Sequence, residues 1–155
     1  MTQEAQEGEH QGYRVLRYAC ILYGIGLLAH GTDHLRRGTD VLTPEVLWAG
    51  ALTTVMGLIL IAVVFSRHRL APLAAAAFGF SNAAGVAAVH LLPHWSAFSD
   101  AFPGGAERGV EATSWAVALI EIAGLLALGV AGTYVLMQGS VVPERSSERS
   151  ANASR

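Results

Sequence analysis

Four apolar runs, each about as long as a lipid bilayer is thick, dominate this chain of 155 residues. A transmembrane helix needs about 20 mostly apolar residues, because each residue advances the helix by about 1.5 Å and the hydrocarbon core is about 30 Å thick. The chain is 52 % hydrophobic and 14 % charged, whereas a soluble domain carries about 25 % charged residues. We therefore predict an all-α, integral membrane four-helix bundle. The predicted transmembrane helices are residues 15–35, 45–65, 71–92 and 113–137.

Both ends of the chain are polar, so we predict disordered tails over residues 1–12 and 138–155 and one transmembrane domain over residues 13–137. Four spans put both tails on the same side, and arginine indicates which side that is. All ten basic residues are arginine. Seven of them lie on the side of the tails, and three lie on the opposite side, namely Arg36, Arg37 and Arg108. An excess of arginine favours the cytoplasm, so we predict a multi-pass protein of the inner (plasma) membrane with both termini cytoplasmic.

The third run is rich in alanine and glycine, and small residues let transmembrane helices approach closely. This composition predicts that the third helix lies at the centre of the bundle. Its one amide, Asn82, is expected to hydrogen-bond to a neighbouring helix. Pro44, at the start of the second run, is typical of the first turn of a helix.

Ionisable residues interrupt three of the four runs. His30, Asp33 and His34 close the first run, and positions i, i+3 and i+4 share one face of a helix. His90 and His94 close the third run with the same spacing of four, and Glu121 lies inside the fourth run. A carboxylate within a span costs about 2.5–3.5 kcal/mol, so it requires a partner, a proton or a cation.

The predicted topology brings these residues to one depth. The first and third spans both run outward, so His34 and His94 lie near the outer surface and His30 and His90 lie roughly 6 Å deeper. Glu121 is six residues below Trp115 in a span that runs inward, which is roughly 9 Å. We therefore predict one shared polar site in the extracytoplasmic half of the bilayer.

Imidazole and carboxylate together form a ligand set for zinc, iron, manganese or copper. The predicted ligands of such a divalent transition metal are His30, Asp33, His34, His90, His94 and Glu121. Glu121 is alternatively a general base, and Asp33 a partner that fixes a histidine tautomer or an ion-pair partner of Arg36 or Arg37. A site at this depth suits redox or hydrolytic chemistry on a lipid-soluble substrate.

Three other functions remain open. Histidines from the first and third spans are potential axial ligands of a b-type haem. Chains of acidic residues and histidine also mark proton or ion transporters, although the inner half of this chain has almost no ionisable residue. In a structural or accessory subunit, the same residues would pair with one another between helices. The expected partners are membrane lipids and either further copies of the chain in a homo-oligomer or other subunits of a larger membrane complex. The four apolar runs contain no Glu-x-x-His motif, and the sequence has no His-Glu-x-x-His motif. The net charge of −2 does not indicate a nucleic-acid partner.

Overall fold

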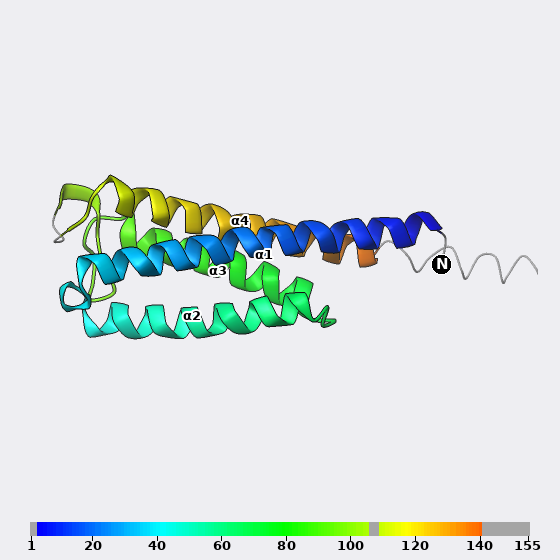
Figure 1. Cartoon of the computed structure of the whole chain (residues 1–155), viewed down its shortest axis with the longest axis horizontal. Helices are drawn as coiled ribbons and strands as arrows, with labels where there is room; N and C mark the ends of the chain where they lie inside the picture. The colour runs from blue at the N-terminus through cyan, green and yellow to red at the C-terminus, as the bar shows by residue number, and fades with distance from the viewer. Residues whose placement is uncertain (1–2, 106–108, 141–155) are drawn as a thin grey trace, which may run out of the picture.

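The computed structural model describes residues 3–105 and 109–140. The secondary-structure elements in these ranges are all helices, as predicted. Four long helices lie side by side in an elongated bundle (Figure 1). They are α1 (Gln3–Arg37), α2 (Pro44–Phe65), α3 (Ala71–His90) and α4 (Ala112–Ser140), with the short 3-10 helices η1 (Thr39–Val41) and η2 (Pro103–Gly105) in the loops. Each of the four long helices contains a segment that is long and apolar enough to cross a membrane.

Local sequence explains where α2 begins and where α3 ends. Thr43 caps α2, because its side chain accepts a hydrogen bond from the backbone N–H of Val46, and Pro44 occupies the first turn as predicted. Helix α3 ends at His90, two residues before the predicted end. Proline disfavours helical geometry in the residue before it, so Pro93 explains why the helix does not continue to His94.

Helix α4, and not α3 as we predicted from composition, lies at the centre of the bundle. It packs along much of the length of both α1 and α3. A Cβ atom at Gly26 of α1 would lie 2.6 Å from the Cα atom of Glu121, and one at Gly79 of α3 would lie 2.5 Å from the backbone nitrogen of Gly129. The glycines therefore set how closely α1 and α3 approach α4.

Helix α2 makes far fewer contacts with α1 and α3 than α4 does. It stands apart from the other three helices over part of its length (Figure 1). Most of its large apolar side chains are exposed, among them Trp48, Leu52 and Leu58. Such a surface is what a helix presents to acyl chains.

The structure differs from two further predictions. Residues 3–12 continue α1 as helix, where we predicted a disordered tail. The side-chain amide of Asn82 donates to the carbonyl oxygen of Phe78 in its own helix, 3.0 Å away, and not to a neighbouring helix. Of the predicted tail over residues 138–155, residues 138–140 belong to α4 and the rest lie outside the described residues.

The close contact at Gly79 gives a first prediction, for the variant Gly79→Ala. The added methyl group would meet the backbone of α4, which cannot move aside as a side chain can. We expect the free energy of unfolding in detergent to fall by about 1–3 kcal/mol, the usual cost of overpacking. Gly85→Ala on the same helix is the matched control, because nothing lies within 4 Å of its Cβ position. Equal stability of the two variants would contradict the predicted packing.

Candidate metal centre

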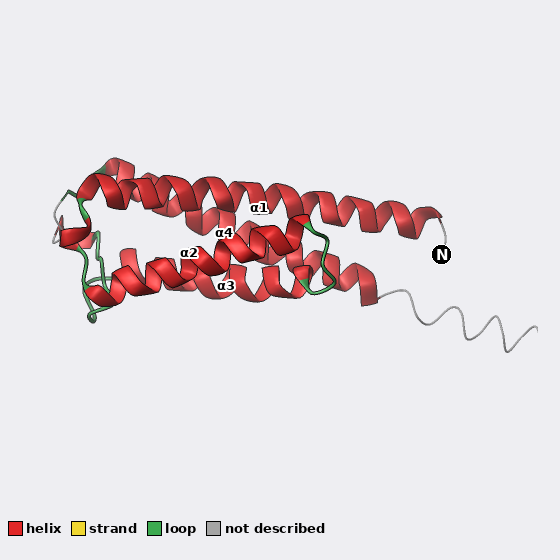
Figure 2. Ribbon diagram, turned by 60° about the horizontal axis from the view of Figure 1, so that its bottom comes forward, coloured by secondary structure: helices red, strands yellow, loops and turns green. Residues whose placement is uncertain are grey.

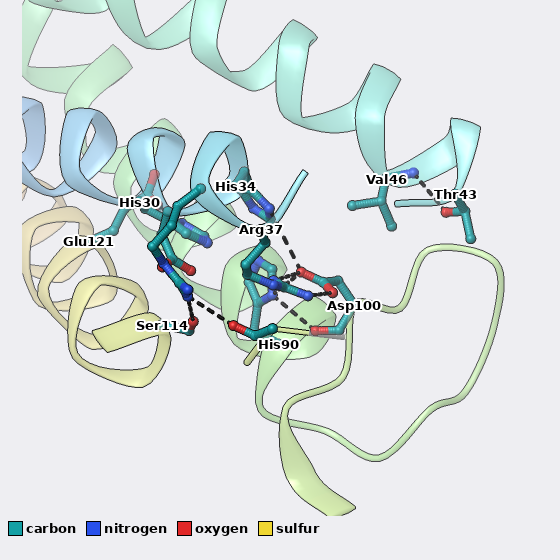
Figure 3. A network of polar contacts seen from close by, with 12 residues as sticks. His30, His34, Arg37, Thr43, Val46, His90, Asp100, Ser114 and Glu121 are labelled. Carbon is teal, nitrogen blue, oxygen red and sulfur yellow. Dashed lines mark hydrogen bonds and ion pairs between the residues drawn. The ribbon is translucent and has the colours of Figure 1, made fainter. Parts of the chain in front are cut away.

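Three histidines from two helices meet near the C-terminal ends of α1 and α3 (Figures 1 and 3). This end of the bundle is opposite the N-terminus of α1 and the C-terminus of α4. His30 and His34 lie one turn apart on α1, and His90 is the last residue of α3. The ring of His30 lies 4.7 Å from the rings of both His34 and His90, measured between centroids. One nitrogen from each ring can be chosen so that the three atoms lie within 4.8 Å of one another. The predicted meeting of the first and third spans is therefore present in the structure.

Each of these imidazoles has a carboxylate beside its Nδ1 atom. The Nδ1 atom of His30 contacts a carboxylate oxygen of Glu121, which confirms that α4 brings this residue to the histidines. The Nδ1 atom of His90 lies 3.1 Å from the backbone oxygen of Asp100 and 3.4 Å from its Oδ2 atom. The Nδ1 atom of His34 lies 3.9 Å from the same Oδ2 atom. A carboxylate at Nδ1 fixes the tautomer of an imidazole and directs Nε2 toward a metal in many metalloproteins.

The site is buried, and some of its polar atoms have no hydrogen-bond partner. His30, His90 and Glu121 are 6 %, 3 % and 3 % exposed. The Nε2 atom of His30 and the Nδ1 atom of His34 are buried, and neither has a hydrogen-bond partner among the described residues. A buried polar atom left in this way costs about 1–3 kcal/mol. A bound cation would satisfy the Nε2 atom of His30.

Asp100 is the member of the site that the sequence analysis missed. It lies in the loop between α3 and α4. This loop and the loop between α1 and α2 lie at the same end of the bundle (Figure 2). The backbone N–H of Asp100 donates to the carbonyl oxygen of Val89, and that of Phe102 donates to the carbonyl oxygen of His90. These two bonds bring the loop back against the end of α3, with Asp100 and Phe102 buried.

A buried arginine holds Asp100 in place (Figure 3). Both terminal nitrogens of Arg37 donate to the carboxylate of Asp100, at 2.7 and 2.6 Å, and both side chains are buried. Burial alone would raise the pKa of Asp100, but the hydrogen bonds from Arg37 and His90 hold that pKa well below its ordinary value. Asp100 is therefore ionised beside His34 and His90. The sequence analysis considered Arg37 as a topology signal and as a possible partner of Asp33, and it did not consider a partner in the loop between α3 and α4.

Asp33 is not among the side chains that form the histidine cluster. Its Oδ1 atom accepts a hydrogen bond of 2.9 Å from Arg36, which is the ion pair that we considered as an alternative. Arg36 also donates to Ser114 near the start of α4 and to the backbone oxygen of Gly109. Asp33 thus takes part in joining α1 to α4, and the group of potential metal ligands does not include it.

His94 is the second predicted ligand that does not belong to the cluster. It lies four residues beyond the end of α3 and is exposed. The spacing of four residues aligns two side chains only within a helix, and the helix ends at His90. Among the described residues, the cluster of potential ligands is His30, His34 and His90.

The histidine cluster faces a cavity of about 370 Å³ between α1, α2 and α3. Most of the wall is apolar, with contributions from Leu27, Val46, Val86 and Phe98. The polar part of the wall consists of the three histidines and Glu121 together with Thr39, Thr53, Thr54 and Asn82. The cluster is therefore open on one side to a space large enough for a small molecule.

The chain matches no family model, no curated protein and no solved structure.

Proposed function

We propose that this protein is a membrane metalloprotein that binds one divalent transition metal ion through His30, His34 and His90. The observation that carries the proposal is the arrangement of the imidazoles, with nitrogens within 4.8 Å of one another and carboxylates beside the Nδ1 atoms. Glu121 and Asp100 orient the ligands in this proposal. Glu121 also lines the cavity, so it remains our predicted general base toward a water molecule on the metal.

Three imidazoles without a directly coordinating carboxylate favour zinc or copper over manganese, which prefers oxygen ligands. Zinc with three protein ligands keeps a fourth position for water or substrate. With zinc–nitrogen distances of about 2.0–2.1 Å, tetrahedral geometry places the nitrogens roughly 3.4 Å apart. Small rotations of the side chains bring the three nitrogens to this separation from their present spacing.

The packing of the rings does not favour haem. Two axial histidines bind opposite faces of a porphyrin, so the macrocycle separates their rings. Here His30 and His90 are in edge-to-face contact, with centroids 4.7 Å apart. The cluster therefore suits a single ion held by adjacent imidazoles better than it suits a b-type haem.

The distribution of polar residues favours a local site over a path for protons or ions. The buried polar and charged residues of the described ranges all belong to the end of the bundle that carries the histidines. They are His30, Asp33, Arg37, His90, Ser99, Asp100, Ser114 and Glu121. The opposite half of the bundle has an apolar core that includes Leu16, Val64 and Leu128, and this core would interrupt a relay across the membrane.

Orientation in the membrane follows from the arginines, as in the sequence analysis. Arg14, Arg17, Arg67 and Arg69 lie near the end of the bundle that is opposite the site. In our proposal this end faces the cytoplasm of the inner (plasma) membrane, and the metal site lies in the extracytoplasmic half of the bilayer.

Metal content of the wild-type protein tests the proposal directly. We expect elemental analysis after purification in detergent, followed by removal of loosely bound ions, to give about one zinc or copper ion per chain. Loading with Co²⁺ is expected to give the visible absorption of a four-coordinate site, and no haem band is expected. A protein that stays folded and binds neither native metal nor Co²⁺ would show that the function is structural or accessory.

The carboxylates that face the Nδ1 atoms give a second prediction, for the conservative variants Asp100→Asn and Glu121→Gln. Both variants keep the shape of the side chain and remove the charge that orients an imidazole. We expect each to weaken the affinity for Co²⁺ by about 10- to 100-fold, the usual effect of such partners. A competitive titration with a chelator measures this change. Affinities within twofold of wild type in both variants would contradict the orienting role.

A further inference from the structure

Three glycines line the cavity beside the histidine cluster, one from each helix that surrounds it. They are Gly31 of α1, Gly50 of α2 and Gly85 of α3. At each of them, nothing lies within 4 Å of the position that a Cβ atom would take. This distinguishes them from Gly26 and Gly79, whose missing side chains allow α4 to approach. Packing between helices therefore does not explain the three glycines.

A glycine within a helix costs roughly 0.5–1 kcal/mol relative to alanine, so a purpose other than packing is expected for these three. Each of them is exposed and also borders the cavity. Side chains at these positions would project into open space and narrow the way into the cavity. The glycines thus keep the mouth of the cavity open.

The mouth lies at a depth where a bilayer presents acyl chains. Gly31 lies six residues from the end of α1, Gly50 six residues from the start of α2, and Gly85 five residues from the end of α3. At 1.5 Å per residue these positions are roughly 8–9 Å below the ends of the helices. The opening therefore faces the side of the bundle and not its end, where the loop carrying Asp100 and Phe102 packs against α3.

The wall of the cavity has an apolar part and a polar part. Leu27, Val46 and Val86 contribute apolar surface, whereas the histidines and Glu121 contribute polar groups. We infer that the cavity admits a small lipid-soluble molecule from the bilayer, with its apolar part along α2 and one oxygen-bearing group on the metal. This inference rests on the proposed metal site, and it adds to the expected lipid-soluble substrate the route by which it enters and the surfaces that bind it.

Hydroxamic acids test the inference, because their head group chelates zinc and cobalt and their alkyl chain can be varied. Acetohydroxamic and hexanohydroxamic acid are titrated into the Co²⁺-loaded protein in lipid nanodiscs, and the visible spectrum reports binding. Four more methylene groups in the cavity are expected to strengthen binding by about 250-fold, since each buried methylene contributes roughly fourfold. The variant Gly85→Leu should lose at least about tenfold of this gain and bind acetohydroxamic acid as the wild type does.

Comparison of variants distinguishes binding in the cavity from simple partitioning of the hydroxamic acid into lipid, because partitioning is the same for every protein tested. Gly50→Leu is the second variant, in case Gly85→Leu does not fold. Ala84→Leu is the matched control, because Ala84 is exposed and adjacent to Gly85 but does not line the cavity. An unchanged Co²⁺ spectrum before titration shows that a variant has kept its site.

Two results would overturn the inference, and they differ from each other. If Co²⁺ binds but Gly85→Leu, Gly50→Leu and wild type respond equally to chain length, the cavity is not the binding site and the proposed metal site still stands. If Co²⁺ does not bind to folded wild-type protein, the proposed function fails and this inference fails with it.

Discussion

Replacement of His90 by alanine is expected to reduce the affinity for Co²⁺ or Zn²⁺ by more than about 100-fold. Removal of a ligand must cost more than removal of a residue that only orients one, which costs about 10- to 100-fold. His90 is the proposed ligand from α3, whereas His30 and His34, the other two proposed ligands, both come from α1. Without His90, α1 alone supplies the ligands, and two imidazoles do not form the three-ligand site of a catalytic zinc.

The matched control is His94→Ala. His94 is near His90 in the chain, but it is exposed and outside the cluster. We therefore expect the metal affinity of this variant to remain within about twofold of wild type. Metal content and Co²⁺ titration of both variants give the comparison. Equal loss of metal in the two variants would mean that the loop brings His94 to the ion, and equal retention would mean that the ion binds elsewhere.

The second large effect is expected for Arg37→Met, which removes one partner of the buried ion pair with Asp100. Both terminal nitrogens of Arg37 are engaged, and neither side chain is accessible to water. Loss of one partner leaves a buried charge uncompensated, which typically costs about 3–5 kcal/mol. We expect this loss in the free energy of unfolding, measured by denaturant titration in detergent micelles.

Two comparisons identify the cause of this loss. The double variant Arg37→Met with Asp100→Leu removes both charges, and we expect it to recover much of the stability, because apolar residues replace buried ion pairs well. Arg14→Met changes an exposed arginine at the other end of the bundle and is expected to change stability by less than about 0.5 kcal/mol. A double variant no more stable than Arg37→Met would indicate that the arginine acts through its other contacts, such as the ring of Phe102.

Length and hydrophobicity were enough to predict the number and type of helices. The apolar runs determine α2 within a residue at each end, because Pro44 and the polar residues after Phe65 bound it clearly. The meeting of His30, His34, His90 and Glu121 also followed from the sequence, since helices of similar length that cross one bilayer bring equivalent positions to equal depth.

The loop contribution could not be predicted in the same way. Asp100 lies ten residues beyond His90, in a segment without periodicity. Hydrogen bonds from the backbone of this loop to α3 and the ion pair with Arg37 bring it to the site. The partners of Asp33 and His34 were also not predictable, because the residues that each side chain contacts depend on where the other helices and the loop pack against α1. Composition also did not identify the central helix. Small residues of α3 such as Gly79 contact α4, but Gly124 of α4 also allows α1 to approach closely.

The groups that meet at the metal centre come from positions 30, 34, 90, 100 and 121 of the chain. A chain emerging from the ribosome therefore contains two of the three imidazoles long before the third, and Glu121 arrives only with the last helix. Insertion of all four helices must precede assembly of the complete centre. In our proposal, acquisition of the ion is thus a late step in biogenesis, which follows the folding of the loop around Asp100.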